Sequence, residues 1–501
     1  MHGNVGLRSW GVLLLGVALC AVVLCAGAAA GPCSANLDGR YVAFSSAWDY
    51  LAFGDKNESG DVFVRDRGTG TTEAITVGDF SGADEASISA DGRYAAFMGC
   101  VHYCAVYVHD RGRRTTRLVS PTIDGEPIEI YTGGVGLSGD GRLVLFTSGA
   151  RNLIDGDTNF AWDVFVRDVA RGTTERANVG SDGVQANGQS GYGALSGDGR
   201  YVAFSSEASN LVPGDTNGGW DVFVRDRRMG TTLRVSRDGD DVRQSSLVDV
   251  SSDGRHVAFN GQSSVLVSDR NGGATELVSV SSTEKPGTQY SEGASISDDG
   301  RYVVFVSSST NLAPRDTNDA NDVFVRDRVA GTTERVSVGT AATQANGASS
   351  AAAISGDGRF VVFLSSASNL VRGDTNRSDD VFVRDLRLRT TELVTVPIAS
   401  LKAKAGKVTL RPSPPHAGKT LDASMRVTAA GNAVARFGVD CHATIDGREL
   451  DARISGSGRA GIATCSWKLP RDSRAKRLSG WLEARTNSNG PVRRPFRARI
   501  E

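Results

Sequence analysis

A single phrase, Asp-Gly-Arg followed by a short apolar run, recurs along this chain about every 50 residues. A period of this length indicates an array of similar supersecondary units. One such unit is too small to bury its own apolar surfaces, so neighbouring copies must stack on one another. Seven copies in one chain are enough to close into a ring. The copies end at Arg40, Arg93, Arg142, Arg200, Arg255, Arg301 and Arg359.

The fourth copy shows the expected unit in full. Val, Phe, Tyr and Thr dominate its apolar runs, and Gly, Asp and Asn separate them, which is typical of strands and turns. The pattern predicts strands at 192–196, 200–205, 221–226 and 231–236, with a long loop at 207–220. The two middle strands are apolar at consecutive positions, so both of their faces must be covered. A four-stranded antiparallel sheet packed between two similar sheets meets this need, and it is the blade of a β-propeller.

The full phrase, Ser-x-Asp-Gly-Arg-Tyr-Val-Ala-Phe-Ser-Ser at 196–206, resembles the repeats of TolB-type, WD-repeat-like β-propellers of bacterial envelope proteins. The resemblance covers 33–396 and implies a propeller fold, while it says little about a ligand. TolB itself carries a separate α/β domain before its propeller, whereas the repeats here begin directly after the leader. The resemblance is therefore to the repeat family, and the Pal system that TolB belongs to is not expected as a partner.

The expected fold class is all-β, with four segments along the chain. We expect a signal peptide at 1–30, a seven-bladed β-propeller at 31–398, a linker at 399–418 and a small Ig-like β-sandwich at 419–501. The leader has Arg8, an apolar run and three alanines in the order that secretory signals use. An uncleaved membrane anchor is the alternative for this segment.

The charge balance and the cysteines indicate where such a protein works. Lys and Arg number 56 and Asp and Glu 57, so no basic field exists to bind a nucleic acid. No apolar segment after the leader is long enough to span a membrane. A secreted or cell-envelope location in a bacterium is expected, with no membrane span after signal cleavage. This oxidising location favours two disulfides, Cys100–Cys104 across a hairpin and Cys441–Cys465 in the last segment, with Cys33 left over.

Two charged residues recur in every repeat. The Arg of the phrase opens the second strand, and an Asp closes the antiparallel third strand, so both lie at the same end of the blade. We therefore predict a cross-strand ion pair inside each blade; a ring of charge on one face is the functional alternative. The Asp residues are Asp66, Asp110, Asp168, Asp226, Asp269, Asp327 and Asp385.

The loop between the second and third strands differs between copies. Five copies carry Asp-x-Asn-x-x-x-Asp, whose oxygen ligands at positions 1, 3 and 7 resemble the start of a calcium loop. The strand that follows carries the twelfth position too far away to act as a ligand. Weak calcium binding is one interpretation, and Asx turns that bond their own backbone are the other. The residues are Asp55, Asn57 and Asp61; Asp157, Asn159 and Asp163; Asp215, Asn217 and Asp221; Asp316, Asn318 and Asp322; and Asp374, Asn376 and Asp380.

The sequence favours binding over catalysis. Its histidines have no metal-ligand spacing, and it has neither a Gly-x-Ser-x-Gly elbow nor a phosphate loop. The connections at 185–188 and 344–347 add Gln and Asn to the face that carries the Asp-x-Asn loops. We expect this face to bind an envelope or extracellular protein, or a cell-wall glycan. The alternatives are a lyase- or glycosidase-like enzyme with a site at the central channel, and a structural module that displays the last domain.

Overall fold

The computed structural model describes most of the chain after the leader. The described residues are 33–47, 51–52, 60–76, 80–101, 104–125, 132–240, 242, 248–272, 275–372, 374, 378–395, 403–411, 413, 415–417, 419–429, 432–433, 438–446, 448–450, 462–485 and 492–501. The expected signal peptide, 1–30, lies outside them. Among the described residues, no helix is long and apolar enough to cross a membrane.

Seven antiparallel sheets of four strands follow one another along the chain, and we number them as blades 1 to 7. Blade 1 is β1 (Cys33–Ala35), β2 (Tyr41–Ser46), β3 (Asp61–Asp66) and β4 (Thr71–Ala74). Blade 2 is β5 (Gly82–Ile88), β6 (Tyr94–Cys100), β7 (Cys104–Asp110) and β8 (Thr115–Leu118). Blade 3 is β9 (Thr132–Leu137), β10 (Leu143–Ser148), β11 (Asp163–Asp168) and β12 (Thr173–Arg176). Blade 4 is β13 (Ser190–Leu195), β14 (Tyr201–Ser206), β15 (Asp221–Asp226) and β16 (Thr231–Arg234).

The remaining three blades have the same strand order. Blade 5 is β17 (Val248–Val250), β18 (His256–Asn260), β19 (Val265–Asp269) and β20 (Glu276–Leu277). Blade 6 is β21 (Ser291–Ile296), β22 (Tyr302–Ser307), β23 (Asp322–Asp327) and β24 (Thr332–Arg335). Blade 7 is β25 (Ser349–Ile354), β26 (Phe360–Ser365), β27 (Asp380–Asp385) and β28 (Thr390–Leu393).

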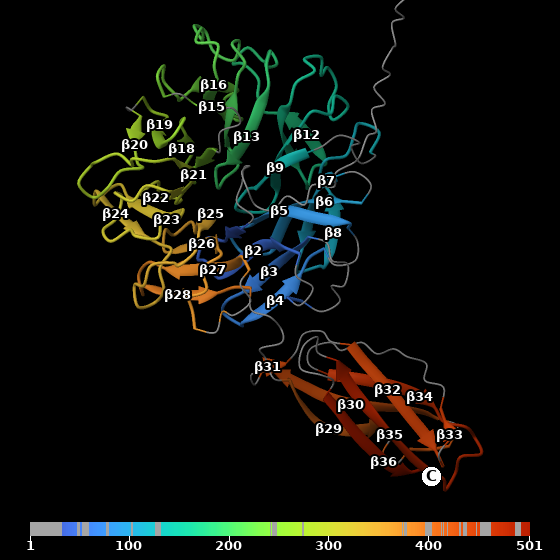
Figure 1. Ribbon diagram of the computed structural model, residues 1–501. Coiled ribbons are helices and arrows are strands. Elements are labelled where there is room, and N and C mark those ends of the chain that lie inside the picture. Colours follow the sequence, from blue (N-terminus) through green and yellow to red (C-terminus); the bar gives the residue numbers. More distant parts are fainter. Residues whose placement is uncertain are drawn as a thin grey trace, which may run out of the picture.

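The seven blades close into a ring, as the repeat predicts. Their first strands lie nearest a common centre (Figure 1), and they contact one another in the cycle β1, β5, β9, β13, β17, β21, β25 and back to β1. The closing joint resembles the internal ones. Arg67 of blade 1 pairs with Glu392 of blade 7, as Arg111 of blade 2 pairs with Glu73 of blade 1 at 3.0 Å. Strands β1 to β28 therefore form a seven-bladed β-propeller.

Apolar packing between blades explains why the middle strands carry no alternation. All six residues of β14 are buried, and Phe204 packs against Phe223 of β15 with ring centroids 5.8 Å apart. Equivalent Phe pairs occupy blades 1, 3, 6 and 7. Each sheet lies between two others, so both of its faces are removed from water, which is the main stabilising contribution to such a fold.

The predicted ion pair is present in every blade. In blade 4, Arg200 donates to Asp226 from Nε at 3.0 Å and from Nη2 at 2.6 Å. Asp226 also accepts from the backbone N–H of Met229, so one carboxylate ties the turn to the strand pair. We call the end of the ring that carries these pairs, with the turns between first and second strands and between third and fourth strands, the turn face. The other pairs are Arg40–Asp66, Arg93–Asp110, Arg142–Asp168, Arg255–Asp269, Arg301–Asp327 and Arg359–Asp385.

The rest of the described chain forms two further four-stranded sheets. One contains β29 (Ala403–Arg411), β30 (Thr420–Ala429), β31 (Asn432–Ala433) and β34 (Ile462–Lys468). The other contains β32 (Gly438–Ile445), β33 (Arg448–Glu449), β35 (Arg477–Arg485) and β36 (Val492–Arg499). Apolar side chains from both sheets, Trp467 and Leu482 among them, form one buried cluster, so this unit is a small β-sandwich.

The predicted linker at 399–418 is wrong in part. β29 lies inside it and pairs along most of its length with β30, from Ala403 with Ala429 to Arg411 with Asp422. The lysines and prolines in this stretch suggested an extended connection. Between them, however, Lys407-Val-Thr-Leu410 alternates polar and apolar residues as a half-buried strand does. The sandwich therefore begins at β29.

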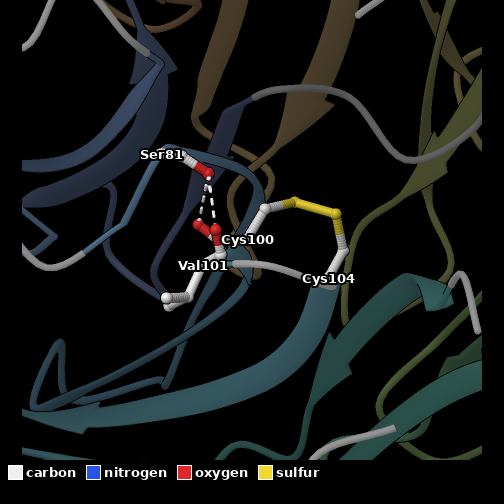
Figure 2. The surroundings of a disulfide bond; sticks show 4 residues. All are labelled: Ser81, Cys100, Val101 and Cys104. Atoms are coloured by element: carbon white, nitrogen blue, oxygen red, sulfur yellow. Dashed lines mark hydrogen bonds between the residues drawn. A yellow bond between two sulfur atoms is a disulfide. The ribbon is translucent and has the colours of Figure 1, made fainter. Parts of the chain in front are cut away.

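One predicted disulfide is confirmed. Cys100 and Cys104 are joined at the hairpin between β6 and β7 (Figure 2). Ser81 closes the same end of the blade, because its hydroxyl donates to the backbone carbonyls of Cys100 and Val101. Cys465 of the sandwich is also disulfide-bonded. The side chain of its predicted partner, Cys441, lies outside the described residues.

Candidate functional site

The end of the ring opposite the turn face carries the loops between second and third strands, together with the connections from one blade to the next. We call it the loop face. Asp55, Asn57 and Asn376 of the predicted calcium loops lie outside the described residues. The other predicted residues lie on this face, in blades 1, 3, 4, 6 and 7.

The Asp at position 7 of each loop is the first residue of the third strand and is buried. Its Oδ1 accepts a hydrogen bond from a polar residue just after the fourth strand, at 2.5 to 2.6 Å. The blades without the loop carry Ala105 and Ser264 at this position. One carboxylate oxygen is therefore used for structure in all five blades. The pairs are Thr76 to Asp61, Asn178 to Asp163, Ser236 to Asp221, Ser337 to Asp322 and Thr395 to Asp380.

An arginine that the sequence reasoning missed lies between the two carboxylates of blade 3. Arg176, the last residue of β12, is 3.2 Å from Asp157 and 3.1 Å from Asp163. All three side chains are at least 94% buried, with exposed fractions of 6%, 2% and 0%. Burial is the main influence on the pKa of Asp163 and raises it, while the bond from Asn178 and the charge of Arg176 act in the opposite direction. The guanidinium supplies a cation at the place where the calcium interpretation would put a metal ion.

The same arrangement recurs in two other blades. Arg335 lies 3.2 Å from Asp316 and 3.3 Å from Asp322 in blade 6. Arg234 lies 3.5 Å from both Asp215 and Asp221 in blade 4. The signal was in the sequence, because these blades end their fourth strand with Thr-Thr-x-Arg, and the blades with short loops end it with Leu118 or Leu277.

The Asn at position 3 of the loop forms an Asx turn, as the second of the two interpretations of these loops predicts. The side-chain oxygens of Asn159, Asn217 and Asn318 accept from the backbone N–H two residues later, at 3.1, 3.0 and 3.3 Å. The side-chain N–H groups of Asn159 and Asn217 donate to the Asp that ends the loop. Asx-turn chemistry is thus confirmed in these three loops. Calcium binding by the loops stays a prediction.

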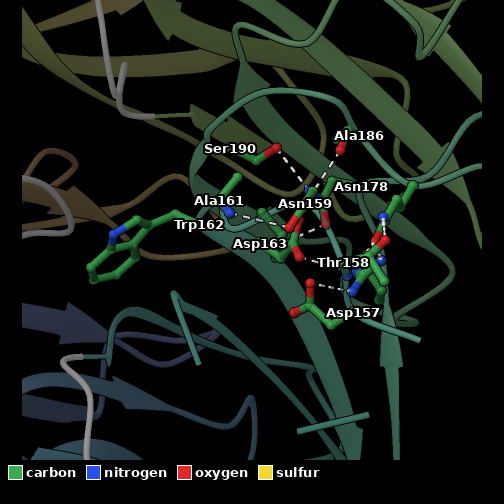
Figure 3. A network of polar contacts seen from close by, with 12 residues as sticks. Asp157, Thr158, Asn159, Ala161, Trp162, Asp163, Asn178, Ala186 and Ser190 are labelled. Atoms are coloured by element: carbon green, nitrogen blue, oxygen red, sulfur yellow. Dashed lines mark hydrogen bonds and ion pairs between the residues drawn. The ribbon is translucent and has the colours of Figure 1, made fainter. Parts of the chain in front are cut away.

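The connections between blades bond to the loops on both sides. Gln185 donates to Thr158 in the blade 3 loop and accepts from Arg176. Two residues on, Asn187 bonds to Asn210 and to Ser209 in the blade 4 loop at 3.0 and 3.1 Å. Gln344 and Asn346 repeat this pattern between blades 6 and 7. Figure 3 shows the blade 3 network, with the side chain of Trp162 directed away from it.

One exposed aromatic residue stands out in this polar network. Phe160 is 75% exposed, and its φ of 57° lies in the left-handed region that bulky residues rarely adopt. The equivalent positions in blades 4 and 6 hold Gly218 and Asp319, with φ of 65° and 53°. The guanidinium carbon of Arg151 lies 4.1 Å from the centre of the Phe160 ring. The turn needs this backbone conformation, but nothing in the turn needs a phenyl ring.

The innermost strands of the blades carry four acidic residues that the sequence reasoning did not consider. Each accepts a hydrogen bond: Asp84 from Ser45, Glu85 from the backbone of Val135, Asp249 from the backbone of Ile296 and Glu292 from Tyr290. Burial raises the pKa of Glu85 to about 7, and the charge of Asp84 adds to this. Burial also raises the pKa of Asp249. Within the described part of the chain, no three His, Cys, Asp or Glu side chains gather as metal ligands.

Comparison with known proteins returns propellers of several kinds. No family model matches the sequence. No curated protein matches it either. Among solved structures, a putative TolB from Agrobacterium tumefaciens is 17% identical, with a TM-score of 0.37, over 58% of this chain and 87% of that one. An oligogalacturonate lyase from Vibrio parahaemolyticus is 14% identical, with a TM-score of 0.45, over 70% of this chain and 88% of that one.

A third similar structure is a puromycin-hydrolyzing peptidase from Mycobacterium tuberculosis. It is 12% identical, with a TM-score of 0.47, over 79% of this chain and 58% of that one. At such values these similarities say nothing about the activity of this chain. The fold assignment rests on the strand order and packing of the chain itself.

Proposed function

We propose that this protein is an exported, non-catalytic scaffold that binds a protein or a cell-wall glycan through its loop face. The observation that carries the proposal is Phe160, an exposed ring on a rigid polar surface. Loops on a fixed scaffold are where proteins most often bind partners. The hydrogen bonds of Gln185 and Asn187 fix these loops in advance, so a partner would not have to order them.

Phe160 is unfavourable for the free protein in two ways. A bulky residue in the left-handed region costs about 1 kcal/mol or more. A largely exposed ring also leaves apolar surface in water. Gly or Asp would serve the turn better, as Gly218 and Asp319 do in blades 4 and 6. A residue that opposes stability on a surface loop is best explained by a contact with a partner, where aromatic residues dominate binding energy.

An extracytoplasmic location forms part of the proposal. The Cys100–Cys104 disulfide and the bonded Cys465 suit an oxidising compartment. The test is to expose live cells of the source bacterium to a membrane-impermeant biotin reagent and recover the protein. Recovery only from lysed cells, with both cysteines of the hairpin reduced, would contradict export.

The experiment for the binding proposal compares two exposed apolar residues on opposite faces. Phe160→Gly removes the ring and suits the backbone, and Val329→Ser removes a residue that is 77% exposed between β23 and β24 on the turn face. Each variant is incubated with an envelope extract and, separately, with insoluble cell wall. We expect Phe160→Gly to weaken capture about tenfold or more with no loss of melting temperature, and Val329→Ser to change neither. Equal capture by all three proteins would refute the loop face as the binding surface.

The acidic residues of the inner strands motivate the enzyme alternative. Glu85, with its pKa near 7, has the proton affinity of a general acid or base. Against this, Asp84, Glu85 and Asp249 each already accept a bond from a neighbouring blade. Glu292 accepts one from Tyr290, two residues before it. Turnover of a polyuronide or another glycan that Glu85→Gln abolishes would favour the enzyme. Binding without turnover would favour the scaffold.

A further inference from the structure

One contact between neighbouring blades is repeated at every joint of the ring. The residue after the Asp-Gly-Arg arginine packs against the glycine of the same phrase in the next blade, so closely that a Cβ added to that glycine would lie 2.0 to 2.5 Å from it. The seventh of these residues, His256 of blade 5, can take up a proton near neutral pH. The other six cannot, and they are Tyr41, Tyr94, Leu143, Tyr201, Tyr302 and Phe360.

An arginine of the next blade lies beside this residue on both sides of blade 5. In the joint between blades 4 and 5, the guanidinium carbon of Arg270 lies 4.3 Å from the centre of the Tyr201 ring. A neutral aromatic ring attracts such a cation. In the joint between blades 5 and 6, the corresponding arginine is Arg328, and its charge acts on His256. The one titratable ring of this series is therefore placed beside a cation.

Arg328 is held at this joint by contacts on two sides. It donates to the backbone carbonyl of Gly300 in its own blade. Its Nε and Nη2 lie 2.9 and 2.8 Å from the carboxylate of Glu276 in blade 5. Only 15% of its side chain is exposed. A positive charge on His256 would thus face a guanidinium that cannot turn away without breaking these bonds.

Four charges act on the His256 ring, two of each sign. The charges of Arg328 and Arg255 oppose a proton there. Asp269, opposite His256 on β19, and Asp253 of the preceding turn favour one, but both carboxylates are already bonded, Asp269 to Arg255 and Asp253 within its own turn. Burial has the largest influence, and together with the two arginines it lowers the pKa of His256 below its ordinary 6.5.

The packing of the ring also favours its neutral form. Nδ1 of His256 is buried against Gly300 and, within the described residues, has no hydrogen-bond partner. A protonated imidazole is a donor at both nitrogens, whereas the neutral ring can leave this nitrogen without a proton. A buried donor that lacks an acceptor lowers stability.

We propose that His256 makes the joint between blades 5 and 6 sensitive to pH: the joint is closed while the ring is neutral and loosens when the ring takes up a proton. In an opened joint the ring would be protonated at its ordinary pKa, 6.5. The contribution of the closed joint is therefore complete above pH 6.5 and is lost as the pH falls through the lower pKa of the packed ring. The proposal does not depend on a binding partner.

The test needs a local readout, which the backbone supplies. The N–H of Ser252 donates to the carbonyl of Asp298 across the joint between blades 5 and 6, at 3.0 Å. The N–H of Gly139 donates to the carbonyl of Gly197 across the joint between blades 3 and 4, at 2.9 Å, where Leu143 replaces the ring. Hydrogen exchange of the full chain at about pH 8 and pH 5 gives the protection of both amides relative to their intrinsic rates. In the wild type, the protection of Ser252 should fall about threefold or more at pH 5, and that of Gly139 should not.

Other carboxylates cannot produce this loss. Burial raises the pKa values of Glu85 and of Asp298, so acidification stabilises the fold at both positions. Despite their burial, Asp253 and Asp269 have pKa values below the ordinary 3.8, because hydrogen bonds stabilise their charged forms. These two carboxylates therefore stay ionised at pH 5.

The decisive variant is His256→Tyr, which gives the joint the ring that Tyr201 supplies one blade earlier. It should be no less stable than the wild type at pH 8 and should keep the protection of Ser252 at pH 5. His256→Leu follows Leu143 of blade 3 and provides the same test if tyrosine does not fit.

The matched control is His109→Arg in blade 2. His109 is also buried, but it stands where blade 3 carries Arg167, so this position accommodates a cation. The variant should retain the full acid response of Ser252.

Three results would overturn the proposal. The first is equal protection of Ser252 in the wild type at the two pH values. The second is an acid-induced loss that persists in both His256 variants. The third is a loss at Gly139 as large as that at Ser252, which would mean that acid loosens the whole ring and not this joint.

Discussion

The two ends of the ring follow different rules. On the turn face, all seven blades carry the same Arg–Asp pair, and the glycine before each arginine has φ between 63° and 71°. On the loop face, five blades carry the acidic loop. Three of these, blades 3, 4 and 6, hold an arginine between two carboxylates, and its side chain is buried in blades 3 and 6. A feature that recurs in every blade serves the scaffold that all blades share. A feature that differs between blades is not needed by the shared scaffold, so it marks a blade with an additional role.

The largest effect should come from breaking a buried pair on the loop face. Arg335→Ala leaves Asp316 and Asp322 buried without their counter-charge, with exposed fractions of 3% and 0%. Removing one partner of a buried ion pair costs about 3–5 kcal/mol of unfolding free energy. Urea denaturation measures the loss. The control is Arg389→Ala. The side chains of Arg389 and Glu334, which form an ion pair, are 70% and 58% exposed, so this pair should contribute no more than about 0.5 kcal/mol to the free energy of unfolding.

A loss of similar size in both variants would mean that the loop-face arginines are not specially buried in solution. The loop face would then tolerate the loss of a charge as an ordinary exposed surface does, and it would not differ from the turn face in the energy of its ion pairs.

Glycine substitutions test the same contrast through the backbone. Gly199 on the turn face has φ +67°, and an added Cβ would lie 2.3 Å from Cδ1 of Leu143. Gly214 on the loop face has φ +79° and nothing within 4 Å of an added Cβ. Gly214→Ala should therefore cost only the left-handed penalty, about 1–2 kcal/mol. Gly199→Ala should cost about 1 kcal/mol more, because the side chain of Leu143 in blade 3 must move. Urea denaturation midpoints measure both losses of stability. Equal losses for the two variants would show that blades 3 and 4 separate easily at this turn.

The sequence predicts the repeated features of this molecule well and the singular ones poorly. The period of the repeat predicts the ring, and the fixed places of Arg200 and Asp226 on neighbouring strands predict their ion pair, because strand register is regular. Arg176 was missed because its contact with Asp157 depends on how a long loop folds back, which no local pattern states. Comparison of the seven fourth strands would have revealed it. β29 was missed because lysines and prolines flank a short strand whose partner, β30, comes later.

The third prediction concerns pH: a carboxylate on the turn face and one in an innermost strand should change stability in opposite directions. The bond from Arg93 lowers the pKa of Asp110 on the turn face from 3.8 to about 2. This carboxylate therefore stabilises the fold fully above pH 3.8, and its contribution disappears as the pH falls through about 2. Burial raises the pKa of Glu85 from 4.5 to about 7, so its contribution is complete below pH 4.5 and disappears as the pH rises through about 7.

The change Glu85→Gln keeps an acceptor for the backbone of Val135 and removes the charge. Between about pH 5 and pH 8 the wild type should lose stability that this variant retains, as urea midpoints at the two pH values would show. Parallel curves for the two proteins would mean that solvent screens the Glu85 carboxylate and that its ionisation does not change the stability of the fold.

The smallest effect is expected at the most repeated feature. Arg200 donates two bonds to Asp226, but its side chain is 33% exposed, so water weakens the attraction between the charges. In a double-mutant cycle, Arg200→Ala and Asp226→Ala should each lower stability, and the double variant should lose less than the sum, because the two residues share one interaction. Asp226→Ala should be the worse single change, since it also removes the acceptor for Met229 in the turn. Strictly additive losses would mean that each residue stabilises the turn separately. The sevenfold repeat of the pair would then reflect the geometry of the turn rather than the attraction between the charges, and the turn face would owe its regularity to backbone conformation alone.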